Sequence, residues 1–133
     1  MAIPGRSLHY IKLDVRFMSK IVRGNLFNKD SYHYNYSSEF FETIFTGNKC
    51  RLERIISSGH TSPAVGWYDQ PEGEFVILLQ GEATLFIENL GEVFLSSGDY
   101  LFIPPHCRHK VVATSTDPPC VWLAWHGDLK PGE

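Results

Sequence analysis

From residue 51 onward, apolar and polar positions alternate over short runs that are rich in β-branched and aromatic residues, with turn residues every 7 to 12 positions. This pattern is typical of short β-strands joined by tight turns. We therefore expect an all-β domain, built as a sandwich, a jelly roll or a barrel. The expected strands are Arg51–Ser57, Val65–Tyr68, Glu74–Gln80, Ala83–Glu88, Glu92–Leu95, Tyr100–Ile103, His109–Ala113 and Val121–Trp125.

The segments between the expected strands have the chemistry of turns. Gly81, Gly91 and Gly98 stand where the chain must reverse, and glycine reaches backbone conformations that other residues avoid. Pro104 and Pro105 cannot donate ladder hydrogen bonds, so they end a strand. His106 is then displayed on the loop that follows.

A short helix is expected ahead of the strands. Ser37 and Ser38 can cap its N-terminus, and an apolar stripe runs through the residues that follow, up to Gly47. The stripe consists of Phe40, Phe41, Ile44 and Phe45, and the first turn holds Glu39 and Glu42. Residues 1–36 are then a partly disordered N-terminal extension, and residues 37–133 are the main domain with its leading helix.

The expected strand Glu74–Gln80 is apolar on both faces, because Val76 and Leu78 alternate with Phe75, Ile77 and Leu79. One face packs into the core. The other needs a cover, which can be a second sheet, the helix or a second subunit. We therefore expect a homodimer.

Composition and charge fit one folded domain of 133 residues, with 43% hydrophobic and 20% charged residues. The net charge of -3 provides no extended basic surface, so nucleic acid is not an expected partner. The longest apolar run, Phe75–Leu79, is too short to cross a bilayer, so no membrane is expected either. The three cysteines, an odd and sparse set, favour a reducing compartment and hence the cytoplasm.

Basic residues are in excess near the N-terminus, without the apolar core of a secretion signal. They are Arg6, Lys12, Arg16, Lys20 and Arg23, against Asp14 alone. We interpret this stretch as a poorly ordered tail, or as the result of a start codon upstream of Met18, in preference to a weak targeting segment.

Two groups of residues have the spacing of known motifs. Six residues separate Glu74 from Gly81, and Gly98 is followed by Pro104 and then His109. In these residues the chain resembles the cupin family, whose first motif is His-x-His, three or four residues, Glu, six residues and Gly. The second motif is Gly, five residues and Pro-x-Gly-x-x-His. The resemblance implies an RmlC-like double-stranded β-helix, or jelly-roll barrel, here with one short N-terminal helix.

The chain departs from these motifs at three positions. Tyr68 and Gln70 stand where the first motif has its two histidines, and His106 replaces the glycine of the second motif. What the resemblance implies is a divalent metal ion, such as Fe, Mn, Ni or Zn, held by nitrogen and oxygen ligands. The implied ligands are Gln70, Glu74, His109 and His106.

Other residues are expected to line the pocket. Tyr68, Trp122 and His126 are the candidates, and Tyr68 and Gln70 are as well suited to hydrogen-bonding a small molecule as to binding a metal. An alternative places His126 in solvent at the end of the last strand. No residue has the partners of a catalytic nucleophile, Cys107 included, so no catalytic residue is assigned.

Two functions are consistent with such a pocket. One is a metal-dependent enzyme of the dioxygenase, isomerase or lyase type, which acts on a small molecule. The other is a binding module for a small ligand, without turnover and without a tightly bound metal. The loss of the first-motif histidines favours the second function, and the fold alone does not choose between them.

Overall fold

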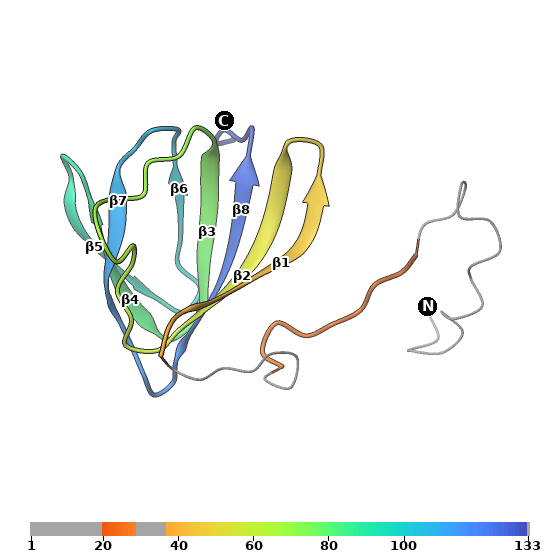
Figure 1. Ribbon diagram of the computed structural model, residues 1–133, viewed down its shortest axis with the longest axis horizontal. Helices are drawn as coiled ribbons and strands as arrows, with labels where there is room; N and C mark the ends of the chain where they lie inside the picture. The colour runs from red at the N-terminus through yellow and green to blue at the C-terminus, as the bar shows by residue number, and fades with distance from the viewer. Residues whose placement is uncertain (1–19, 29–36, 133) are drawn as a thin grey trace.

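The computed structural model describes residues 20–28 and 37–132 (Figure 1). The described residues form eight β-strands and no helix. The strands are β1 (Phe40–Gly47), β2 (Cys50–Ser57), β3 (Gly73–Gln80), β4 (Glu82–Ile87), β5 (Gly91–Ser96), β6 (Tyr100–Ile103), β7 (His109–Thr114) and β8 (Cys120–Gly127). This confirms the expected all-β class.

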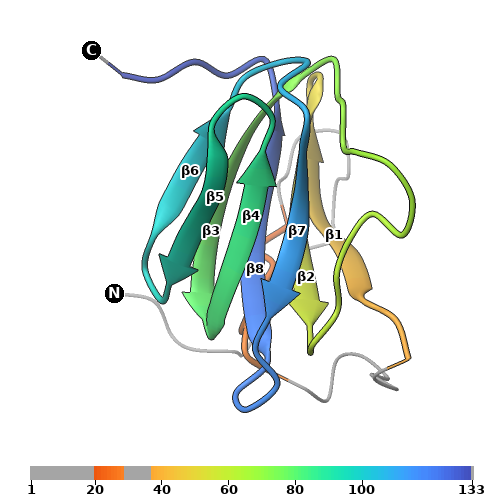
Figure 2. The ribbon, with the colours of Figure 1, turned by 90° about the vertical axis from the view of Figure 1, so that its left-hand side faces the viewer.

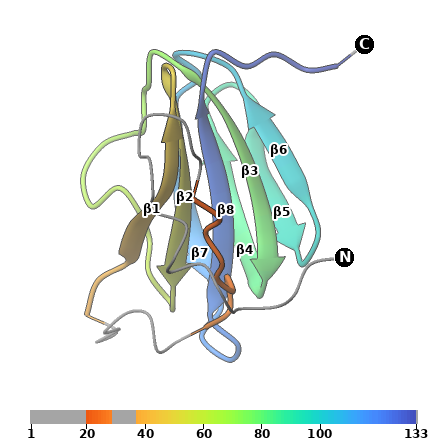
Figure 3. The same ribbon diagram turned by 90° about the vertical axis from the view of Figure 1, so that its right-hand side faces the viewer.

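The strands form two antiparallel sheets that face each other. One sheet has the order β1-β2-β8-β3-β6, and the other has the order β5-β4-β7. The three-stranded sheet is in front in Figure 2, and the five-stranded sheet is in front in Figure 3. Apolar side chains from the facing sides of both sheets form the core, with Leu78, Ala124, Ala83 and Leu85 among its most buried members. The chain thus buries its core between two layers, as a sandwich or jelly roll must.

One expected strand is absent. Residues 58–72 form a loop in which Tyr68 makes an isolated bridge with His109, and Val65 is exposed. The prediction of a strand at Val65–Tyr68 is wrong because this segment pairs with the sheet at single points only. Pro63 and Gly66 interrupt it, and neither supports a continuous ladder.

The expected N-terminal helix is also wrong, since its residues form β1. The strand pairs with β2 in an antiparallel ladder, with Glu42 opposite Arg54, and the two strands are joined by the two-residue turn Asn48-Lys49. The apolar stripe was compatible with a helix, but its residues are mostly aromatic or β-branched, which favours a strand. A helix this short has little stability of its own, so pairing with β2 decides the structure.

The predictions about the N-terminal extension fall mostly on residues 1–19 and 29–36, which lie outside the described residues. Residues 26–28 lie against the outer face of the five-stranded sheet. There the buried Arg54 guanidinium donates hydrogen bonds to the carbonyl oxygens of Leu26 (3.1 Å) and Asn28 (3.3 Å), and it pairs with Glu42. In the part of the chain that the structure describes, no helix has the length and apolar character needed to cross a bilayer.

Candidate functional site

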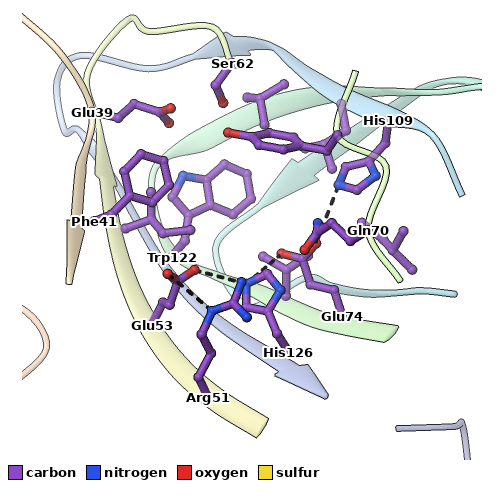
Figure 4. A pocket seen from close by; sticks show the side chains of 16 residues that line it. Glu39, Phe41, Arg51, Glu53, Ser62, Gln70, Glu74, His109, Trp122 and His126 are labelled. Carbon is purple, nitrogen blue, oxygen red and sulfur yellow. Dashed lines mark hydrogen bonds and ion pairs between the residues drawn. The ribbon is translucent and has the colours of Figure 1, made fainter. Parts of the chain in front are cut away.

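A cavity of about 340 Å3 lies between the two sheets. Its wall combines polar and charged side chains with an apolar surface, and Figure 4 shows these side chains from close by. The residues that line it are Glu39, Phe41, Arg51, Glu53, Ile55, Ser62, Tyr68, Gln70, Glu74, Val76, Leu85, Ile103, His109, Val111, Trp122 and His126.

The two-residue period of the strands places these side chains together. Alternate residues of a strand share a face, so Arg51, Glu53 and Ile55 of β2 all face the cavity. The ladders then align neighbouring strands, and His126 of β8 stands opposite both Arg51 of β2 and Glu74 of β3. Four charged or titratable side chains therefore meet on one side of the cavity.

Glu74 and His109 come from opposite sheets and meet across the cavity. His109 Nε2 lies 3.5 Å from Glu74 Oε1, and His109 Nδ1 lies 2.9 Å from the carbonyl oxygen of Cys107, to which it donates. Burial lowers the pKa of His109, but the hydrogen bonds to Glu74 and Cys107 outweigh burial, so the net shift is upward. The contact with Glu74 therefore favours the protonated form of His109 more than water favours that of a free histidine.

A second imidazole and carboxylate lie next to the first pair. His126 Nε2 is 3.0 Å from Glu53 Oε1 and 3.8 Å from Glu74 Oε2. The hydrogen bond from His126 lowers the pKa of Glu53, more than partial burial raises it. Arg51 adds a further cation, with its Nε 3.7 Å from Glu53 Oε2. The result is a row of alternating carboxylates and imidazoles, Glu53, His126, Glu74 and His109, that crosses from β2 to β7.

Tyr68 and Gln70 reach the cavity from the loop before β3. Backbone hydrogen bonds in both directions with His109 fix Tyr68, whose ring centre lies 5.5 Å from that of His109. Burial raises the pKa of Tyr68, and the nearby carboxylates raise it further. Tyr68 is therefore a neutral phenol. Gln70 Nε2 donates a hydrogen bond of 3.2 Å to Glu74 Oε1.

Trp122 forms an apolar part of the wall and is held by a chain of hydrogen bonds. Its indole Nε1 donates to Ser57 Oγ (3.1 Å), and Ser57 Oγ donates to Glu39 Oε2 (2.6 Å). Ser57 is fully buried, and Trp122 is only 4% exposed. These hydrogen bonds therefore hold both the Trp122 ring and the Glu39 carboxylate in place in the cavity wall.

The structure does not bring His106 into the cavity. Its side chain is 69% exposed, and its Nδ1 lies 2.9 Å from Asp69 Oδ1 on the outside of the loop. The backbone turns sharply after Pro104 and Pro105, with His106 in the left-handed region at φ 58°, and this turn directs the side chain outward. Of the four ligands that the sequence implied, the structure brings together Gln70, Glu74 and His109.

The residues present do not fit the metal centre of three histidines and one glutamate that the family motifs describe. A neutral phenol, as at Tyr68, is a poor ligand, and the Gln70 amide nitrogen faces Glu74 as a donor. Among residues 20–28 and 37–132, no group of three or more His, Cys, Asp or Glu side chains is arranged to hold a metal ion.

Sequence reasoning missed several residues of the cavity. Arg51 and Glu53 stand at alternate positions of a strand, where charged side chains ordinarily indicate a solvent-facing side. Glu39 and Phe41 were assigned to a helix, which concealed the face they share with β2. The sequence signal that could have found them is Ile55, an apolar residue that shares a strand face with Arg51 and Glu53 and so indicates that this face is buried.

Comparisons with known proteins give one family. The model of the cupin domain, Cupin_2, matches residues 55–126, more than half of the chain. A crystal structure from Ralstonia eutropha JMP134, described as a "putative mannose-6-phosphate isomerase", is 36% identical in sequence, with a TM-score of 0.74, and the match covers 82% of this chain and 100% of that chain. No curated protein matches the sequence at a significant level.

More distant structures show the fold alone. A cupin superfamily protein from Desulfitobacterium hafniense DCB-2 is 15% identical, with a TM-score of 0.62 over 75% of this chain and 86% of that chain. An RmlC-like cupin with a double-stranded β-helix fold, from Methanocaldococcus jannaschii, is 12% identical, with a TM-score of 0.58 over 73% of this chain and 86% of that chain. These similarities confirm the double-stranded β-helix that the motifs implied.

Proposed function

The chain belongs to the cupin family, and on that premise we propose that its cavity binds a small hydroxylated molecule of about monosaccharide size. In this proposal the pocket's own carboxylates and imidazoles contact the ligand directly. A metal centre of the family type is not required for binding. The observation that carries the proposal is the row formed by Glu53, His126, Glu74 and His109, with successive N to O distances of 3.0, 3.8 and 3.5 Å.

The chemistry of the wall supports a hydroxylated ligand. Carboxylates accept hydrogen bonds from hydroxyl groups, and the Gln70 amide and the Tyr68 phenol can both donate and accept. Phe41, Ile55 and Trp122 supply an apolar surface for the C–H faces of the same molecule. A ligand with hydroxyls on one side and carbon on the other matches this division.

The size of the cavity supports a single small molecule. Ligand pockets in proteins span about 300–1,000 Å3. At about 340 Å3, the cavity lies near the lower end of that range. The relative from Ralstonia eutropha carries the name of an enzyme that acts on a sugar phosphate, which also favours a sugar-like ligand here.

The proposal is tested by calorimetric titration with D-mannose. We expect measurable binding to the wild type and a loss of at least about tenfold in affinity for Glu74→Gln, because the central carboxylate then accepts fewer hydrogen bonds. Glu88→Gln is the matched control, since Glu88 pairs with Arg108 away from the cavity. Absence of heat with wild-type protein, or equal losses in both variants, would contradict the proposal.

A metal-assisted form of the same pocket is a second candidate. The observation that favours it is that Glu74 and His109, the two implied ligands whose residue types match the motifs, lie 3.5 Å apart inside the cavity. Elemental analysis of untagged protein is the test. Near-stoichiometric Fe, Mn, Ni or Zn that is lost in both Glu74→Ala and His109→Ala would support this form, and a metal-free wild type after loading would refute it.

We also propose that the chain forms a homodimer through the outer face of the five-stranded sheet. Phe75 and Ile77 of β3 alternate with the inward residues, and their ladder partners include Trp125 and Tyr100. Trp125 is 44% and Tyr100 is 64% exposed, which leaves aromatic surface for a partner to cover. A monomeric mass in light scattering would refute this proposal.

A reducing compartment, and hence the cytoplasm, stays our proposal for the location of the protein. It is supported by Cys50, Cys107 and Cys120, which are all free thiols.

A further inference from the structure

The cations that line the cavity are already matched by carboxylates. Among residues 20–28 and 37–132, Arg51 is the only lysine or arginine that lines the cavity, and the two imidazoles are His109 and His126. Three carboxylates face them, namely Glu39, Glu53 and Glu74. The lining is therefore neutral when both imidazoles are protonated and carries a net charge of -2 when both are neutral, so it is positive in neither state.

Each cation has a specific carboxylate beside it. His126 Nε2 is 3.0 Å from Glu53, and His109 Nε2 is 3.5 Å from Glu74. Arg51 lies 3.7 Å from Glu53 through Nε and 3.4 Å from Glu72 through Nη1. If an anionic ligand pairs with one of these groups, the carboxylate beside that group loses its partner. That carboxylate then lies next to the negative charge of the ligand.

Glu53 and Glu74 each contact two of these groups, but only Glu53 contacts Arg51, the one group of the described lining that is charged at every ordinary pH. Its side chain is 17% exposed, and that of its partner His126 is 6% exposed, so their interaction is only weakly screened by solvent. Helix N-termini, which bind phosphate through free backbone N–H groups, are not available here, since the described residues form no helix. The positive charge for an anion would have to come from Arg51, His109 and His126, and two of these three contact Glu53.

We infer that the ligand of the cavity is uncharged, a free sugar or polyol as opposed to a sugar phosphate or an acid, and that Glu53 is the residue that excludes anions. This inference rests on the proposed function and adds the class of ligand to it. The ligand inferred here therefore differs from the sugar phosphate in the name of the Ralstonia eutropha relative, because it carries no phosphate.

The alternative is that the Glu53 pairs serve only the stability of the sheet. A structural role predicts that Glu53→Gln weakens folding and leaves ligand choice unchanged. The inference predicts a shift of preference toward anions, because the variant removes the carboxylate that contacts both Arg51 and His126 and keeps the size of the side chain, while Arg51 stays beside Glu72 and His126 beside Glu74. Ligand choice therefore separates the two roles.

The test compares D-mannose, D-mannose 6-phosphate and inorganic phosphate as probes for wild type, Glu53→Gln and the control Glu88→Gln. Amide and side-chain NMR shifts locate each probe, and the fold of each variant is checked in the same spectra. We expect wild type and Glu88→Gln to bind D-mannose at least about tenfold more tightly than its 6-phosphate, because the phosphate would lie beside carboxylates of like charge. In Glu53→Gln we expect this ratio to fall well below its wild-type value, and inorganic phosphate to shift cavity residues.

The outcomes separate the inference from the proposed function. Phosphate binding in the cavity of the wild type, or in none of the three proteins, would overturn the role of Glu53. Equal preference in wild type and Glu53→Gln would also overturn it. If D-mannose fails to bind while phosphate binds only to Glu53→Gln, the proposed function is refuted, and the exclusion of anions by Glu53 is supported.

Discussion

Ser57→Ala tests how the cavity wall is held in place. The hydroxyl of Ser57 accepts the hydrogen bond of Trp122 Nε1 at 3.1 Å and donates to Glu39 Oε2 at 2.6 Å. Ser57 has no exposed surface and Trp122 is 4% exposed, so water cannot replace the hydroxyl at the indole. The substitution removes one oxygen atom and creates little empty space, so the loss of hydrogen bonds dominates its effect.

The magnitude follows from the two bonds. A buried donor left without a partner costs about 1–3 kcal/mol, which applies to the Trp122 indole. The bond to the Glu39 carboxylate adds about 1 kcal/mol, less than a fully buried charged bond, because Glu39 borders the cavity and can bind water there. We expect the free energy of unfolding to fall by about 2–4 kcal/mol.

Urea denaturation of wild type, Ser57→Ala and Ser97→Ala provides the assay, with the change in midpoint interpreted at a constant m-value. Ser97 is the matched control, because its hydroxyl donates to the Leu79 carbonyl at the exposed surface (2.8 Å), and its loss should cost under about 1 kcal/mol. We also expect D-mannose affinity to fall in Ser57→Ala alone. A loss below about 0.5 kcal/mol for Ser57→Ala would refute the reasoning.

Three further predictions follow from the same contacts. Gly127→Ala should lower the free energy of unfolding by about 1–3 kcal/mol or more in urea denaturation, because its Cβ would lie 2.7 Å from a side chain and 3.0 Å from a backbone carbonyl of the adjacent hairpin; an unchanged midpoint would contradict this. The pKa of Glu53 is lower in the folded protein than its ordinary value of 4.5, so ionised Glu53 stabilises the fold at pH values above 4.5. This stabilisation is lost as the pH falls through the folded-state pKa. His126→Gln should raise the pKa of Glu53 and shrink that loss, as measured by carboxyl NMR and by melting temperature from pH 7 to 3, and an unchanged Glu53 titration would count against the pair. The double variant Tyr68→His, Gln70→His supplies the two histidines of the first family motif. Calorimetry should therefore show that it binds Zn or Ni more tightly than the wild type does, and equal affinities would contradict this prediction.

Most of the fold was predictable because strand signals are local. Runs such as Tyr100–Ile103 are bounded by turn residues on both sides, and the structure has β6 at the same residues. The loop at Val65–Tyr68 and the strand at Phe40–Gly47 were not predictable, since their local patterns suit two structures. Residues 40–47 form a strand because they pair with β2, and this pairing is not visible in their local sequence. The segment at Val65 forms no strand because it has no continuous partner in the described residues.

The site was only partly predictable for a similar reason. Glu74 and His109 were found because their spacing matches family motifs. Glu53 has no such spacing, and its role depends on the register that sets β2 beside β8, with Arg51 opposite His126. His106 stands where the second motif has its glycine, so it was included as a ligand candidate, but the turn after the two prolines directs it away from the cavity.

The most direct test of the account is a D-mannose titration of chelator-treated, metal-free protein, followed by NMR. We expect shifts centred on the Trp122 indole and the Gln70 side-chain amide, since both line the cavity, with the same affinity before and after chelation. Loss of binding on chelation would show that the ligand depends on a metal ion. Shifts confined to residues outside the cavity would contradict the central claim that the carboxylates and imidazoles between the sheets form the binding site.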